Sequence, residues 1–283
     1  MERRRLTFLS VMLCATGCVL MPGCQPQKEA ETAPQICTVS TDTIVRLQEG
    51  EKVPTCKINL DFSYLQPASE SDSLSTQINA TIIRTVFGSS YETLQPDKVL
   101  PALAESYIEN YKTDVKGLFE ADLHNGMKPD DVPAWYNYEY QLNTEMKEGK
   151  KGVWNYTVTD FQYTGGAHPN TTITCLNINQ ETGKILKEDD VFNEKDTASI
   201  CKLIMNELIK EVNQRMDTDT ITSLDGLQSM GILLDTYLYI PSNFLLEKEG
   251  VTFYYNRYEI APYSAGDFRL TVNYDDIQSY LKH

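Results

Sequence analysis

The spacing of the apolar residues changes twice along this chain, and these changes limit the folds it can adopt. Apolar and polar residues alternate over 56–64, as in a half-buried strand. Helical spacing follows over 74–88 and again after Pro96, and alternation returns from Trp135 to Tyr163 with a turn in the middle. Because strands and helices come in blocks rather than in βαβ units, the sequence predicts an α+β fold with antiparallel sheets.

The second half of the chain continues this pattern. A strand is expected over 172–178, with a turn that leads into Ile185-Leu186, and a helix capped by Asp196. Residues 217–235 are irregular, and three further strands are predicted by the alternating runs 244–246, 251–255 and 268–272.

The N-terminus has the features of an export signal. Three arginines, Arg3 to Arg5, precede the apolar run Leu6–Leu20, which is short for a membrane span. Gly23 stands before Cys24 and polar residues follow, which resembles a bacterial lipoprotein cleavage site. We therefore expect a signal peptide over 1–23, lipid on Cys24, and a flexible tether over 24–40. Cleavage before Cys18, a simple signal peptide or an uncleaved anchor are the alternatives.

Four cysteines remain after the expected lipidation site: Cys37, Cys56, Cys175 and Cys201. Four cysteines allow three pairings, and an oxidising compartment favours the local pairs Cys37–Cys56 and Cys175–Cys201. The alternative is four unpaired thiols. None has the spacing of a zinc ligand, so no metal is expected.

The charge of the chain excludes one class of partner. The full chain has a net charge of −15, and removal of residues 1–23 leaves 22 Lys and Arg against 39 Asp and Glu, or −17. Nucleic acid is therefore not an expected partner, because phosphate binding needs the opposite sign. A cationic protein would be attracted, although such a charge can also serve solubility alone.

One short segment concentrates residues with special backbone geometry. Gly165 and Gly166 are followed by His168 and Pro169, the only His-Pro pair in the chain. Glycines permit positive φ or close approach of another chain, and proline favours an extended residue before it. The segment predicts a corner that holds one imidazole in place, either as a site or as a joint between strands.

Together with Asn177–Gly183 and two C-terminal runs, this segment carries a family resemblance. The runs are Val251–Tyr255 and Tyr258–Gly266, with Glu259, Pro262 and Tyr263 in the second. The chain resembles a family of bacterial extracytoplasmic domains that includes the ectodomain of the lysozyme-sensing anti-sigma-V factor, the non-catalytic N-terminal part of certain peptidoglycan deacetylases, and lipoproteins of unknown function. The resemblance implies two adjoining α+β modules that meet near residue 170, which we place at 41–170 and 171–283, and it does not imply catalysis.

The same residues could instead form an active site. His168, Glu259 and Asp267 are an acid/base set on paper, but no nucleophile motif or second suitably placed histidine accompanies them. The structural interpretation is a joint in which Glu259 accepts hydrogen bonds from Gly165-Gly166 or from His168, with Tyr258, Pro262 and Tyr263 packed around it.

We therefore expect a lipid-anchored binding module of the cell envelope, non-enzymatic and without a cofactor. Its ligand would be a cationic, lysozyme-like protein, or peptidoglycan or another glycan. There are two alternatives. One is an envelope hydrolase that uses His168 with Glu259 or Asp267, and the other is a purely structural lipoprotein.

Overall fold

The computed structural model describes residues 34–50, 52–128 and 131–282, and Pro34–His283 forms one compact unit. The expected signal peptide, Cys24 and the first part of the tether lie outside the described residues. No described helix is long and apolar enough to cross a bilayer.

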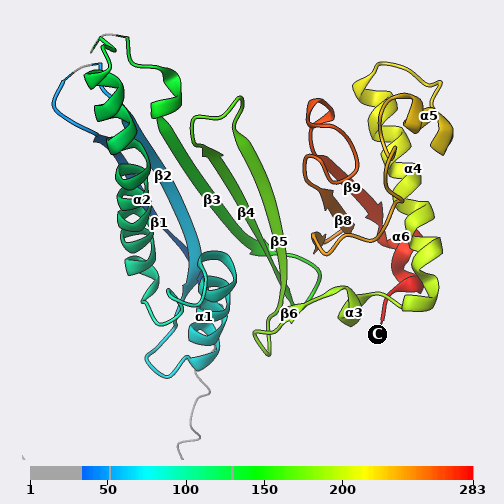
Figure 1. Ribbon diagram of the computed structural model, residues 1–283. Helices are drawn as coiled ribbons and strands as arrows, with labels where there is room; N and C mark the ends of the chain where they lie inside the picture. The colour runs from blue at the N-terminus through cyan, green and yellow to red at the C-terminus, as the bar shows by residue number, and fades with distance from the viewer. Residues whose placement is uncertain (1–33, 51, 129–130, 283) are drawn as a thin grey trace, which may run out of the picture. The chain divides into compact units, whose positions relative to one another are not determined.

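A six-stranded sheet forms the first half of this unit, in the order β1-β2-β3-β4-β5-β6 (Figure 1). Its strands are β1 (Gln35–Arg46), β2 (Thr55–Gln66), β3 (Tyr138–Glu148), β4 (Val153–Tyr163), β5 (Asn170–Asn179) and β6 (Ile185–Leu186). Neighbouring strands are antiparallel except β2 and β3, which run parallel. The predicted antiparallel sheets are confirmed with this pair as the exception, because the two helices between β2 and β3 form a crossover that returns the chain in the same direction.

Two helices, α1 (Ser73–Phe87) and α2 (Pro96–His124), pack on one face of this sheet. Asp72 precedes α1 and caps it, since its carboxylate accepts a hydrogen bond from the Ser75 amide at 3.0 Å. The helices bury their apolar stripes against side chains of β2, β3 and β4, and together these form one core.

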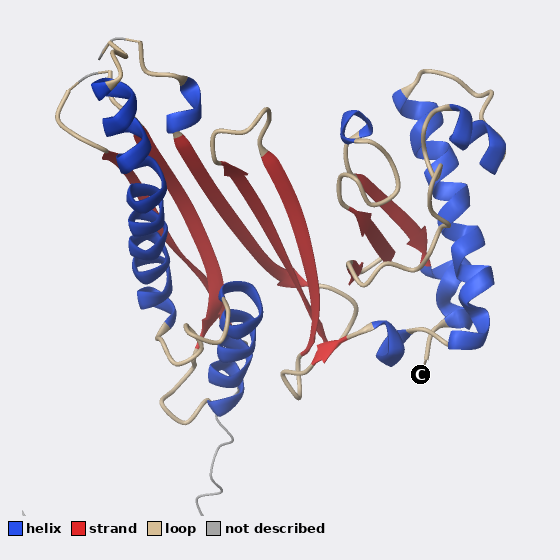
Figure 2. Ribbon diagram, viewed as in Figure 1, coloured by secondary structure: helices blue, strands red, loops and turns tan. Residues whose placement is uncertain are grey.

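The second half contains a three-stranded antiparallel sheet in the order β7-β8-β9, with helices on its side away from the first sheet (Figure 2). Its elements are β7 (Phe244–Leu246), β8 (Gly250–Tyr255), β9 (Phe268–Asn273), α3 (Glu188–Val191), α4 (Thr197–Arg215), α5 (Leu224–Ser229) and α6 (Tyr274–Ile277). The 3-10 helices of the chain are η1 (Ala134–Tyr136), η2 (Glu194–Asp196), η3 (Tyr263–Ala265) and η4 (Gln278–Tyr280). The buried face of α4 and the inner sides of β8 and β9 make a second core.

Two asparagine side chains, the buried Asn177 and the half-buried Asn243, join the two sheets. Asn177 of β5 accepts a hydrogen bond from the Leu246 amide at 2.7 Å and donates one to the Phe244 carbonyl at 2.9 Å. In return, Asn243 accepts from the Cys175 amide at 2.7 Å and donates to the Ile173 carbonyl at 2.8 Å. Each amide therefore replaces a strand partner along an edge that would otherwise be unpaired.

The α+β fold is confirmed, but its predicted boundaries need correction. Residues 35–40 belong to β1 rather than to the tether over 24–40, and β1 pairs with β2 along its whole length. The boundary between modules 41–170 and 171–283 falls at the first residue of β5, which pairs with β4 and so belongs to the first sheet. The irregular run 217–235 contains α5, and Asp196 precedes α4 without a capping hydrogen bond from its side chain.

The predicted disulfides are wrong, since all four cysteines are free. Cys37 lies opposite Tyr64 and Cys56 lies opposite Val45, at the two ends of the β1–β2 hairpin. Eight residues of strand separate these positions, a distance of about 26 Å, and a disulfide needs Cα atoms closer than about 7 Å. Cys175 packs with Leu245 and Tyr254 between the sheets, whereas Cys201 lies on α4.

Candidate functional site

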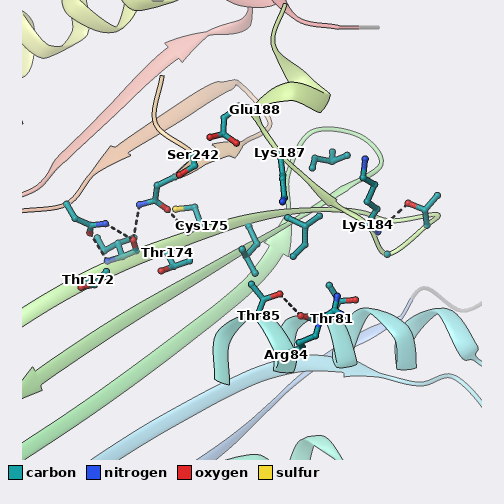
Figure 3. Close-up of a pocket in the computed structure, with 18 of the residues that line it drawn as sticks. Thr81, Arg84, Thr85, Thr172, Thr174, Cys175, Lys184, Lys187, Glu188 and Ser242 are labelled. Carbon is teal, nitrogen blue, oxygen red and sulfur yellow. Dashed lines mark hydrogen bonds between the residues drawn. The ribbon is translucent and has the colours of Figure 1, made fainter. Parts of the chain in front are cut away.

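A groove of about 980 Å³ lies over β5, beside α1 (Figure 3). Thr81, Arg84 and Thr85 of α1 line one side, and Thr172 and Thr174 of β5 lie on its floor. Residues 187 and 188, after β6, line the far side together with residues 242, 243 and 256 at the ends of β7 and β8. The lining is mixed, because these hydroxyl, amide and charged groups share it with the apolar side chains of Ile173, Leu176, Ile185 and Leu186.

A second hollow of about 520 Å³ adjoins the groove, because Thr85, Thr172 and Thr174 line both. It runs along β4 toward the Gly-Gly-Ala-His segment and is lined by Asp160 and His168 among others. We call the two hollows together the sheet groove. Its combined length follows the strands, as an elongated ligand would require.

The sheet groove begins where one face of the sheet changes from apolar to polar. Trp154, Tyr156 and Val158 of β4 belong to the first core, and Asp160 and Gln162 continue on the same face. On β5 the core residues Leu176 and Ile178 give way in the same manner to Thr174 and Thr172, which pair with Val158 and Asp160. The helical cover ends at this register, and the polar side chains line the space beyond it.

Asp160 is a site residue that the sequence reasoning missed. Its carboxylate accepts hydrogen bonds from Gln162 at 2.9 Å and from the Tyr140 hydroxyl at 3.3 Å. Burial raises the pKa of Asp160, and these two hydrogen bonds oppose the shift. Asp160 occupies the next inward position after Trp154, Tyr156 and Val158. A carboxylate at the next position of an apolar alternation was therefore the sequence signal that could have identified this residue.

An aromatic cluster stands at the His168 end of the sheet groove. The His168 and Tyr263 rings are stacked with centroids 3.9 Å apart, and the Tyr258 ring lies 5.6 Å from that of Tyr263. His168 Nδ1 contacts the Pro169 carbonyl at 3.3 Å, which it can only approach as a donor, and its Nε2 lies 3.5 Å from the Tyr258 hydroxyl. The Gly-Gly-Ala-His segment and the Tyr258–Gly266 run are therefore in contact through their aromatic side chains.

Tyr263 fixes this arrangement from both sides. Its hydroxyl donates to the Pro169 carbonyl at 3.1 Å and accepts from Arg257 Nη1 at 3.0 Å. The Arg257 guanidinium also lies 4.6 Å from the centre of the Tyr263 ring. Tyr258 has φ of 70°, a value that is uncommon for a residue of this size, and the residue is 62 % exposed.

Glu259 does not make the contacts expected of it. Its carboxylate accepts from the Tyr239 hydroxyl at 3.1 Å and from Asn256 Nδ2 at 3.3 Å, rather than from Gly165, Gly166 or His168. The residue lies in the turn after β8, where it supports the Asn256 side chain that binds β5.

Asp267 and Pro262 also lie apart from the imidazole contacts. The Asp267 carbonyl accepts from Arg215 at 2.7 Å, and Pro262 precedes η3 and lies near Gly231. The set His168, Glu259 and Asp267 is therefore not assembled as an acid/base site. Among the described residues, no group of three or more His, Cys, Asp and Glu could hold a metal ion.

The two adjacent glycines have different roles. Gly165 has φ of +84°, and a methyl group there would lie 2.9 Å from the carbonyl carbon of Trp135 and closer still to its oxygen. Gly166 has open space, since the nearest atom to an added methyl group is the His168 carbonyl oxygen at 3.9 Å. Close approach of η1 therefore requires glycine at 165 only.

Comparison with protein families matches one part of the chain. Residues 189–275, which run from α3 to α6, match the family described as protein of unknown function (DUF3298). This region contains the three-stranded sheet and α4. A search of curated proteins finds no match.

Two solved structures that are described as DUF3298 proteins are similar to this chain over most of its length. A DUF3298 family member from Bacteroides fragilis is 26 % identical with a TM-score of 0.78, covering 89 % of this chain and 94 % of that one. A DUF3298 family protein from Pseudomonas aeruginosa is 16 % identical with a TM-score of 0.49, covering 88 % and 95 %. The first similarity extends the shared fold beyond 189–275 to the six-stranded sheet. Neither description refers to an anti-sigma factor or to a deacetylase.

Proposed function

We propose that this protein is an exported, non-enzymatic binding module whose sheet groove takes a glycan of the cell envelope. The observation that supports this most is a hollow along the strands in which hydroxyl, amide and charged groups are interspersed with apolar side chains, with an aromatic cluster at one end. Sugar rings present hydroxyl groups at their edges and C–H groups on their faces. The former need hydrogen-bonding partners, and the latter pack against apolar side chains and rings, such as Leu176 and His168 of the groove lining.

The tether and the address come from the sequence. Lipid on Cys24 would hold the module at a bacterial membrane, where peptidoglycan or another envelope glycan lies within reach. The motifs at 163–168 and 258–266, which we interpret as resembling the anti-sigma-V ectodomain and the non-catalytic part of peptidoglycan deacetylases, would imply the same compartment and ligand class.

The test is calorimetric titration of the protein with chitooligosaccharides and with soluble peptidoglycan fragments. Thr174→Val removes a hydroxyl group from the groove floor and keeps the β-branched shape, so folding should be unaffected. It should weaken glycan binding about 5- to 10-fold, as expected for one lost hydrogen bond of about 1 kcal/mol. Thr43→Val on the edge strand β1 is the matched control and should change nothing. Wild-type protein that binds none of these glycans would rule out the proposal.

A second candidate ligand, a cationic protein, is favoured by a different surface. Leu234, Tyr237 and Tyr258 are 59 %, 89 % and 62 % exposed, and Asp235 and Glu259 line a hollow of about 360 Å³ together with Leu234 and Tyr258. Exposed tyrosines beside carboxylates, on a chain of net charge −15, suit a basic partner. Titration with a lysozyme would test it. Tyr237→Ala should weaken that binding and leave glycan binding unchanged, and equal affinity of the variant and wild type would exclude this surface.

The hydrolase alternative has the Asp160 carboxyl and the His168 imidazole in one hollow as its support. Release of reducing ends from the same oligosaccharides distinguishes the two ideas. We expect none from wild type, and turnover that is lost in Asp160→Asn would replace the binding proposal by a catalytic one.

A further inference from the structure

The part of the sheet groove next to β6 differs in charge from the rest of the chain. Three cations line it, Arg84 from α1 and Lys184 and Lys187 from the segment around β6, on a chain whose net charge is −15. Glu188 and Glu259 are the acidic residues of the same lining. The lining therefore has more positive than negative side chains, although the chain as a whole is strongly acidic.

Two of these cations have no acidic partner within the described part of the chain. Asp190 uses one carboxylate oxygen for the Lys184 ammonium at 2.6 Å and the other for the Lys187 backbone amide at 3.0 Å. Asp190 therefore does not pair with the Lys187 ammonium, and no other carboxylate of the described residues forms an ion pair with it. Arg84 has no acidic residue at the helical neighbour positions 80, 81, 87 and 88, and its side chain is exposed to the groove.

The two acidic lining residues are directed elsewhere. The Glu259 carboxylate accepts hydrogen bonds from Tyr239 and Asn256. In Figure 3 the Lys187 side chain points to the α1 side of the groove, whereas that of Glu188 does not. Arg84 and Lys187 therefore face the same space from opposite sides, α1 and the β6–α3 connection.

We propose that this end of the sheet groove is a carboxylate subsite, with Arg84 and Lys187 as its cations, so that the ligand is a carboxylated glycan. The inference rests on the proposed function and adds the substrate class. An arginine fork binds the two oxygens of a carboxylate, and a lysine opposite adds a second charge-assisted donor. The neutral threonines of the floor would contact the sugar hydroxyl groups that follow, toward the aromatic cluster.

The carboxylate could stand on the sugar or on an attached peptide, so three probes separate the sources. They are a neutral N-acetylglucosamine tetrasaccharide, the N-acetylglucosamine–N-acetylmuramic acid disaccharide with its lactyl carboxylate, and the same disaccharide with an alanyl-isoglutamine peptide. Calorimetry gives the affinities at 50 mM NaCl, where charge interactions are weakly screened, and at 500 mM NaCl, where they are strongly screened. A carboxylated probe should bind about 10- to 150-fold more tightly than the neutral one at low salt, the range for one charge-assisted hydrogen bond.

Arg84→Gln and Lys187→Gln should each remove most of that preference and leave the affinity for the neutral tetrasaccharide unchanged. Lys57→Gln, an exposed change on β2 that does not line the groove, is the control and should keep the preference. Equal binding of neutral and carboxylated probes would overturn the subsite and leave the glycan groove in place. Binding of none of the three probes would overturn both.

Discussion

Replacement of Gly165 by alanine should destabilise the protein strongly. The residue has φ of +84°, where a Cβ atom costs about 1–2 kcal/mol. The new methyl group would also lie 2.9 Å from the carbonyl carbon and 3.0 Å from the Cα atom of Trp135, and both belong to backbone. Because backbone cannot rotate away as a side chain can, displacement of η1 adds about 1–3 kcal/mol, the usual cost of overpacking. The expected loss is about 2–5 kcal/mol in the free energy of unfolding.

Thermal and urea denaturation followed by circular dichroism measure this loss. With about 2–4 °C per kcal/mol for a chain of this size, Tm should fall by roughly 5–15 °C. Gly166→Ala is the matched control one residue away, since an added methyl group there meets nothing closer than 3.9 Å. It should stay within about 0.5 kcal/mol of wild type. Equal stability of the two variants would refute the reasoning from close approach.

Three further predictions concern the joint, the groove carboxylate and the thiols. Asn177→Ala should cost about 2–5 kcal/mol in the free energy of unfolding, because it leaves the Leu246 amide and the Phe244 carbonyl buried without partners; urea denaturation showing less than 1 kcal/mol would mean that water replaces the side chain. The raised pKa of Asp160 means that the folded state binds its proton more tightly, so the stability this carboxyl contributes is present at low pH and is lost as pH rises through the folded pKa. Asp160→Asn should therefore stabilise the protein more at pH 7 than at pH 4 relative to wild type, and an identical difference at both values would contradict the assignment. Burial raises the pKa of Cys56 to about 11 and that of Cys175 to about 12, so both should resist iodoacetamide at pH 8 in the native protein and react after denaturation without reductant; peptide mapping that finds either in a disulfide would contradict the free thiols.

The sequence predicted most of the elements because their periods are strong. Strand β2 and helix α1 each show a clean apolar pattern, and both were identified from it. Strand β1 was missed because it is an edge strand whose inward side chains are only half-buried, with small residues in place of large apolar ones: Cys37, Val39, Thr41, Thr43 and Val45. The disulfides were wrong because closeness in sequence was used in place of strand register, which puts Cys37 and Cys56 at opposite ends of one hairpin.

The candidate site shows the same limit. The nearness of His168 to the Tyr258–Tyr263 segment was expected, but its contact there is with the Tyr263 ring and not with Glu259. Ring stacking leaves no pattern in the sequence from which this partner could be predicted. The sheet groove itself needed the register of β4 against β5, which sets Asp160 beside Thr172. Arg84 and Lys187 are far apart along the chain, and only the packing of α1 near β6 places them around one space.

The parallel pairing of β2 with β3 has a consequence for the order in which the protein folds. The sheet consists of two antiparallel parts, the β1–β2 hairpin and the β3–β6 meander, and each can form from contacts that are local in sequence. The parallel register from Cys56↔Tyr138 to Asp61↔Asn143 joins them and must wait until the long segment with α1 and α2 has closed, so we expect this seam to form late. Arg84 and Thr85 belong to the segment that closes, whereas Thr172 and Thr174 belong to the meander. A ligand in the groove would therefore hold the seam shut, and its binding would slow unfolding of the sheet.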